Sequence, residues 1–185
     1  MSAAQKSRSR VLPRCFVALR PDAAARDQLD ALARELERDC PGSRRMQPGN
    51  LHLTLAFIGA LDSGLATALC NDLKKIEVPD TAWMIDRVDG FRHARVAWAG
   101  GASDPQLSAL AEVVRQDLDT RTVPYDRKAF FGHVTLLRHV AQFEPRELAQ
   151  PIRWRLVRPV LMVSETDVVG QLHYRCWIET PTAQE

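Results

Sequence analysis

Two copies of the pattern His-x-Thr are the residues of this chain best suited to chemistry. His52 and Thr54 lie in the apolar run LHLTLAF, and His133 and Thr135 lie in the run GHVTLL. Residues i and i+2 of a strand point to the same face, so each pair presents an imidazole beside a hydroxyl. Two imidazoles at one ligand suit cleavage of a phosphate ester, because one accepts a proton and the other donates one. Histidine serves both tasks because its ordinary pKa, about 6.5, is close to neutral.

A purely structural origin of the two motifs is the alternative. Both histidines could be core-strand residues that happen to precede a threonine. Two polar pairs pointing into a core would need hydrogen-bond partners to offset their desolvation. The recurrence of the pattern in each half of the chain also argues against coincidence, which a single copy would not.

The elements that must position these motifs occur twice in the same order. Each unit has a short apolar strand, an amphipathic helix with one apolar stripe, a loop and a motif strand. The predicted ranges are 15–19, 22–39 and 51–58 for the first unit, and 95–99, 105–118 and 130–137 for the second. Other predicted elements are a helix at 63–73, a short helix around 145–150, and strands at 81–88, 154–157, 160–164 and 173–178.

This repetition indicates an internal duplication within an α+β fold. We expect a bilobal molecule with two mainly antiparallel β-sheets related by pseudo-twofold symmetry, helices on the outside and a central cleft. Residues 14–180 would form this single domain, with halves at roughly 14–90 and 91–180. Residues 1–13 are polar and basic, and we expect them to be a disordered leader.

Composition excludes several classes of protein. The chain has 185 residues, is 45% hydrophobic and carries a net charge of +2, so it can bury a core but lacks the charge of a general nucleic-acid coat. Local basic spots remain open, for example Arg44 and Arg45. No apolar run is long enough to span a membrane. The four cysteines have no zinc or redox spacing, and without an export signal they are expected to be reduced thiols of a cytoplasmic protein. We expect no metal, no cofactor and a monomer.

Around the motifs the chain resembles the two-histidine (2H) phosphoesterase superfamily, and within it the bacterial and archaeal RNA 2′,3′-cyclic phosphodiesterases, once described as 2′-5′ RNA ligases. The similar segments are RCFVAL from Arg14, NLHLTLAFIG from Asn50, and Phe130 to Arg138. The resemblance extends from about Arg14 to Ile178. Two departures are Met46, where the family often has an aromatic residue, and Gly132, where it often has proline.

The resemblance implies a metal-independent enzyme that hydrolyses 2′,3′-cyclic phosphate ends of RNA to a 2′-phosphate. We assign His52 as proton donor and His133 as proton acceptor, although pseudo-symmetry leaves the roles exchangeable from the sequence. Thr54 and Thr135 would hydrogen-bond the non-bridging phosphate oxygens, where negative charge lies in the transition state. The same site could run reversible 2′-5′ RNA ligation, with a hydroxyl in place of water.

Arg138 is the further candidate, as a bidentate phosphate ligand. Strict alternation places it on the face opposite His133, so the strand must end or bulge near Leu137 for Arg138 to reach the phosphate. Otherwise it is a solvated arginine at a strand end. The alternative function is a non-catalytic RNA- or nucleotide-binding module that uses the same cleft; loss of a motif residue would mark it, and all four are present.

Overall fold

We describe the fold from a computed structural model, which covers residues 14–166 and 172–177. The leader expected at residues 1–13 lies outside them. The strands are β1 Arg14–Leu19, β2 Arg44–Arg45, β3 Leu53–Ala60, β4 Ala82–Phe91, β5 Val96–Gly100, β6 His133–Arg138, β7 Arg146–Arg155, β8 Val160–Thr166 and β9 Leu172–Cys176. The helices are α1 Ala23–Asp39, α2 Ser63–Leu73 and α3 Pro105–Thr120, and a 3₁₀ turn covers Pro48–Asn50.

The strands form one antiparallel sheet in the order β7-β4-β5-β6-β3-β1-β8-β9, with the short β2 paired to β6. The two motif strands, β3 and β6, meet at its centre through one register pair, Leu53 opposite Val134. Outwards from this pair, each motif strand is followed by its own unit's first strand, β1 or β5, and then by two further strands. A pseudo-twofold relation would produce this order. The predicted α+β class, with helices and antiparallel strands, is confirmed. The described strands form one sheet where two were expected, because β3 and β6 pair directly with each other.

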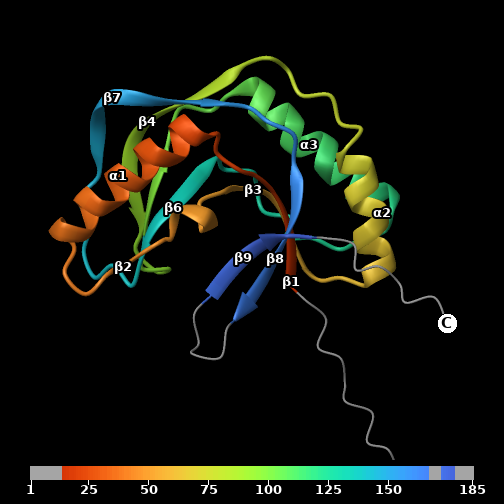
Figure 1. Ribbon diagram of the computed structural model, residues 1–185, viewed down its shortest axis with the longest axis horizontal. Coiled ribbons are helices and arrows are strands. Elements are labelled where there is room, and N and C mark those ends of the chain that lie inside the picture. The colour runs from red at the N-terminus through yellow and green to blue at the C-terminus, as the bar shows by residue number, and fades with distance from the viewer. Residues whose placement is uncertain (1–13, 167–171, 178–185) are drawn as a thin grey trace, which may run out of the picture.

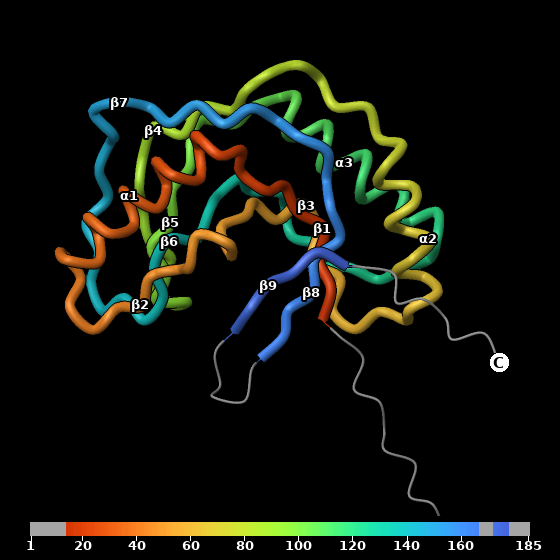
Figure 2. The backbone as a smooth tube through the Cα atoms, viewed as in Figure 1, coloured from red at the N-terminus to blue at the C-terminus, as the bar shows by residue number. Residues whose placement is uncertain are grey.

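The chain interleaves across the sheet. β4, from the first expected half, pairs with β5 and β7, whereas β8, from the second, pairs with β1. Helices cross over as well: α1 follows β1 but packs on β6 and β7, and α3 follows β5 but packs on β3 (Figure 1). The tube in Figure 2 shows α1 on one side of the molecule and α2 with α3 on the other. Each side of the central junction is therefore covered by a helix from the other repeated unit.

Local signals in the sequence explain where the two long helices begin. Asp22 caps α1 by accepting a hydrogen bond from the backbone nitrogen of Ala25 at 3.0 Å, and Asp104 caps α3 in the same way from Leu107 at 2.8 Å. Pro105 occupies the first turn of α3, where its missing N–H costs nothing. The buried face of each helix is apolar: Ala25, Leu29, Leu32, Ala33 and Leu36 in α1, and Leu107, Leu110, Ala111, Val114 and Leu118 in α3.

The short helix predicted around residues 145–150 is wrong. Residues 146–150 belong to β7, which pairs with β4 and forms one edge of the sheet. Most side chains between Arg146 and Pro151 are exposed, so the segment has no alternating apolar pattern to mark it as a strand. Its pairing with β4 decides its conformation, and Pro151 is tolerated because an edge strand need not donate from every residue.

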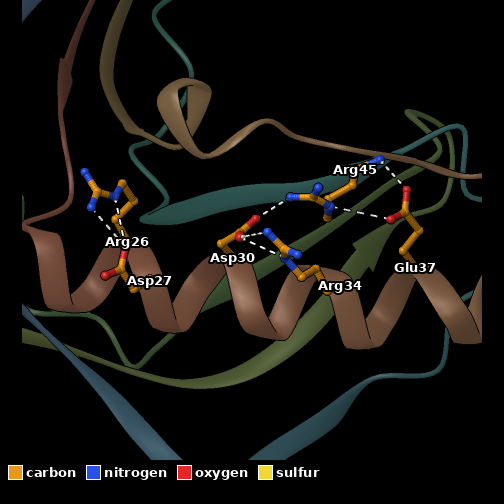
Figure 3. A network of polar contacts seen from close by, with 6 residues as sticks. All are labelled: Arg26, Asp27, Asp30, Arg34, Glu37 and Arg45. Atoms are coloured by element: carbon orange, nitrogen blue, oxygen red, sulfur yellow. Dashed lines mark hydrogen bonds and ion pairs between the residues drawn. The ribbon is translucent and has the colours of Figure 1, made fainter.

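An ion-pair network ties α1 to β2, beside one motif strand. Asp30 pairs with both Arg34 and Arg45, and the Arg45 side chain also lies 3.5 Å from Glu37 (Figure 3). The backbone of β2 in turn pairs with β6, opposite Leu137 and Arg138. Arg45, one of the two arginines that could have formed a local basic spot, is thus committed to holding β2 in place.

Candidate active site

A cleft of about 340 Å³ brings the five predicted site residues together. It lies where the two motif strands meet, and it is lined by Arg14, Phe16, His52, Thr54, Phe57, His133, Thr135, Arg138, Ser164, Leu172 and Tyr174. The other three histidines, His93, His139 and His173, do not line it. The histidine and threonine of each motif share one wall because residues i and i+2 point to the same side of an extended chain.

Both motif histidines are oriented in the same way. The Nδ1 atom of His52 lies 2.7 Å from the backbone carbonyl oxygen of Asn50, and that of His133 lies 2.9 Å from the carbonyl oxygen of Phe131. A carbonyl oxygen only accepts, so Nδ1 is the protonated nitrogen of each neutral ring. The Nε2 atoms are therefore left to exchange protons with a ligand in the cleft.

Burial lowers the pKa of both rings. For His52 the pKa falls to about 4, mainly through desolvation and further through the positive charges of Arg138 and His133, against the opposing hydrogen bond to the Asn50 carbonyl. For His133 desolvation also lowers the pKa, and the hydrogen bond to the Phe131 carbonyl opposes it. Both imidazoles are consequently neutral near pH 7 when the cleft holds no anion.

A β-bulge turns Arg138 into the cleft. Ala97 of β5 lies opposite Leu137 of β6, but the next residue, Trp98, lies opposite Thr135, so Leu136 is an extra residue in the strand. Leu136 and Leu137 are both buried. After this shift of one residue, Arg138 shares the cleft with the motif residues. The bulge that the sequence required for Arg138 to reach the site is thus present.

The first motif strand carries an equivalent bulge. Val17 of β1 lies opposite Ala56, and Ala18 lies opposite Thr54, so Leu55 is the extra residue. Phe57 therefore reaches the cleft from β3 as Arg138 does from β6. Sequence reasoning missed Phe57; its spacing of five residues after His52, the same as that of Arg138 after His133, was the available signal.

The surroundings of Arg138 favour the binding of an anion by its guanidinium. One of its Nη atoms lies 3.4 Å from the Tyr174 hydroxyl oxygen, whereas its Nε atom is buried without a hydrogen-bond partner. Within the described part of the chain, no carboxylate forms an ion pair with it. Arg14 borders the same cleft, with its guanidinium 5.5 Å from the centre of the Phe57 ring. Two cations thus face the cleft without a fixed counter-ion among the described residues.

Asn50 is a second residue that sequence reasoning missed. It is only 8% exposed, and its side chain bridges to β9: the amide donates to the carbonyl of Leu172 at 3.2 Å, and its oxygen accepts from the backbone nitrogen of Tyr174 at 3.0 Å. Tyr174 is thereby held edge-on to the His52 ring, with centroids 4.9 Å apart. Asn50 thus orients His52 through its backbone and the opposite wall through its side chain.

The two positions at which the sequence departs from the 2H phosphoesterases lie near the cleft but do not line it. Met46, where that family often has an aromatic residue, is buried in the core, and its backbone nitrogen bonds to the carbonyl of Leu136 at 2.8 Å. Gly132 precedes His133 without lining the cleft. Among residues 14–166 and 172–177, no group of histidine, cysteine and acidic side chains could hold a metal ion, and no helix is long and apolar enough to cross a bilayer.

Comparison with known proteins agrees with the fold and the motifs. Residues 19–98 match the family model described as LigT like Phosphoesterase. The chain is 30% identical over 100 residues to the RNA 2′,3′-cyclic phosphodiesterase of Escherichia coli K12, covering 54% of this chain and 57% of that one. It is 27% identical over 128 residues to the protein of the same name from Archaeoglobus fulgidus, covering 68% and 72%. The first match thus spans little more than half of the relative's length.

Solved structures match over a longer stretch. The structure of E. coli LigT complexed with 3′-AMP superposes with a TM-score of 0.76 and 23% identity, covering 90% of this chain and 95% of that one. TT0787 of Thermus thermophilus superposes with a TM-score of 0.66 and 25% identity, covering 88% and 94%. The chain therefore has the fold of E. coli LigT, and its residues 19–98 are similar to the LigT-like phosphoesterases.

Proposed function

We propose that the protein hydrolyses 2′,3′-cyclic phosphate ends of RNA to a 2′-phosphate, by two-histidine acid-base catalysis that requires no metal. One observation carries this proposal: two imidazoles with the same tautomer line one cleft together with two threonines and an arginine that has no counter-ion among the described residues. The names of the E. coli and A. fulgidus relatives support the choice of substrate.

The negative charge of the substrate has a defined place in this scheme. The buried Nε of Arg138 lacks a partner, so a phosphate oxygen that it binds compensates its desolvation. Thr54 and Thr135 donate their hydroxyl protons to the non-bridging oxygens, on which charge builds up in the transition state. A bound phosphodiester anion also offsets the desolvation that lowers the two histidine pKa values, and one ring can then take up a proton.

Hydrolysis then requires one neutral and one protonated imidazole. His133 accepts a proton from water at Nε2, the water oxygen bonds to phosphorus, and the bond from phosphorus to O3′ breaks. His52 donates its Nε2 proton to O3′, which leaves a 3′-hydroxyl and a 2′-phosphate. We assign the base to His133 because it lies nearer to solvent, from which the water arrives. His52 is then the acid, and because burial lowers its pKa it takes up its proton only when the phosphodiester anion is bound.

The same groups serve when a 5′-hydroxyl replaces water, which gives reversible 2′-5′ ligation.

We propose that the enzyme works as a monomer, since residues from both units of one chain complete the cleft. A cytoplasmic location accords with its four cysteines, whose spacing matches no zinc or redox pattern.

The test is to incubate the protein with a 2′,3′-cyclic nucleotide in EDTA and to identify the product by chromatography against 2′- and 3′-monophosphate standards. Turnover to the 2′-monophosphate is expected. Turnover that EDTA abolishes would contradict the metal-independent mechanism, and a 3′-monophosphate product would reverse the assignment of the leaving oxygen. Binding of the nucleotide without turnover would favour the non-catalytic binding module.

A further inference from the structure

The aromatic rings of Phe91 and Phe131 lie beside His133 and are exposed to solvent, although hydrolysis alone gives them no role. Phe91 lies edge-on to the His133 ring with centroids 5.1 Å apart, and Phe131 is roughly stacked on it at 5.6 Å. These two phenylalanines are 38% and 49% exposed, and they belong to the small group of large apolar side chains in the described structure that face solvent. An exposed aromatic surface next to a reacting group is a place where a planar ligand can stack.

These rings are held in place before any ligand arrives. Trp98 is buried beneath both of them, with its ring centroid 5.4 Å from that of Phe91 and 5.0 Å from that of Phe131. The carbonyl of Phe131 accepts the Nδ1 proton of His133, and the backbone of Phe91 pairs with Val96. A ligand that stacks here therefore loses little binding energy to ordering of the protein.

There is also room beyond the rings. Phe91 lines a cavity of about 400 Å³ formed by the β4–β5 turn and the segment that follows β6. Arg92 lines this cavity too, and its guanidinium forms no ion pair with the described residues. The surface that starts at His133 thus continues from two aromatic rings into an open cavity, which Arg92 and Arg95 line together with the carboxylates Asp89 and Glu144.

The position of Phe91 and Phe131 beside His133 decides which of the two nucleosides of a substrate can stack on them. In the proposed reaction the ribose that carries the cyclic phosphate lies on the side of the leaving oxygen, next to His52, where Phe57 is 40% exposed. His133 serves the opposite side, where the nucleophile attacks. A water molecule needs no stacking surface there, whereas a nucleoside with a 5′-hydroxyl does.

We infer that Phe91 and Phe131 bind the base of a second nucleoside, whose 5′-oxygen replaces water as the attacking group; this inference rests on the proposed function. In that reaction the 5′-hydroxyl gives its proton to His133, O5′ bonds to phosphorus, and the bond to O3′ breaks as His52 protonates that oxygen. The product is a 2′-5′ phosphodiester with a free 3′-hydroxyl. In reverse, the 3′-hydroxyl gives its proton to His52 and O3′ bonds to phosphorus, while the bond from phosphorus to O5′ breaks as His133 protonates that oxygen.

The experiment compares two substrates that differ in the second nucleoside. One is adenosine 2′,3′-cyclic phosphate, and the other is the 2′-5′-linked dinucleoside adenylyl-(2′→5′)-adenosine, which contains both bases. The variants are Phe131→Leu and Phe91→Leu, with Leu65→Ala as a control because Leu65 is an equally exposed apolar residue of α2 that does not line the cleft. The measured quantity is the ratio of kcat/KM on the dinucleoside to kcat/KM on the cyclic nucleotide.

Loss of a base-stacking ring lowers this ratio by about tenfold in each phenylalanine variant, and Leu65→Ala leaves it at the wild-type value. An unchanged ratio in both phenylalanine variants would overturn the inference. A raised ratio would overturn it too, because the rings would then contact the base of the cyclic nucleotide. Wild-type protein that hydrolyses the cyclic nucleotide but never cleaves the dinucleoside would show that no second nucleoside is accepted. Failure on both substrates would instead refute the proposed function itself.

Discussion

Acidification should destabilise the protein through His52. Burial lowers the pKa of this side chain to about 4 in the folded protein, whereas in the unfolded chain it returns to its ordinary value of about 6.5. Between these two values the unfolded state binds more protons, so the free energy of unfolding falls as the pH drops through 6.5. The loss from this one group reaches about 2 kcal/mol at pH 5 and about 3 kcal/mol at pH 4.

The assay is urea unfolding at pH 7, 6 and 5, followed by tryptophan fluorescence, of the wild type and of His52→Asn. Asparagine keeps a side-chain N–H for the Asn50 carbonyl but does not titrate, so the difference between the two proteins isolates His52. That difference should shift in favour of the variant by about 2 kcal/mol between pH 7 and pH 5. A difference that does not change with pH would refute the claim that His52 is desolvated in the folded protein.

Three further substitutions test the surroundings of the cleft. Arg138→Gln should weaken binding of inorganic phosphate by about tenfold or more in calorimetric titration, because the anion loses a charged bidentate partner; an unchanged affinity would place the anion elsewhere. Asn50→Ala should lower the free energy of unfolding by about 2 kcal/mol, since two buried hydrogen bonds to β9 are lost, whereas the exposed Asn71→Ala should cost far less. Asp30→Asn should cost about 1–3 kcal/mol by breaking a half-buried ion pair, against under about 1 kcal/mol for the exposed pair in Asp27→Asn; equal losses would contradict this.

The features of the fold and the site that the sequence predicted depend on local patterns of residues. The two His-x-Thr motifs and the apolar stripes and first residues of α1 and α3 depend on neighbours within a few positions, and each lies where its pattern indicates. The single-face rule for residues i and i+2 was enough to place each threonine beside its histidine. The five predicted site residues therefore meet in one cleft, while their catalytic roles stay predictions.

What escaped sequence reasoning depends on partners far along the chain. The bulge at Leu136 exists because of how β6 pairs with β5, so the sequence stated it only as a condition for Arg138. Asn50 bonds to residues 172 and 174, more than a hundred positions away. The edge strand β7 is set by β4, and its exposed residues carry no pattern of their own. The exchange of α1 and α3 between the two repeated units is likewise a tertiary choice that no local signal encodes.

The central claim is that His52 and His133 together perform the proton transfers. The most direct measurement is kcat for a 2′,3′-cyclic nucleotide with His52→Asn, His133→Asn and, as a matched control, His139→Asn, whose histidine is exposed and lies outside the cleft. We predict that each of the first two variants loses about 100-fold or more, while the control keeps the wild-type rate. A wild-type rate in either His52→Asn or His133→Asn would contradict the account.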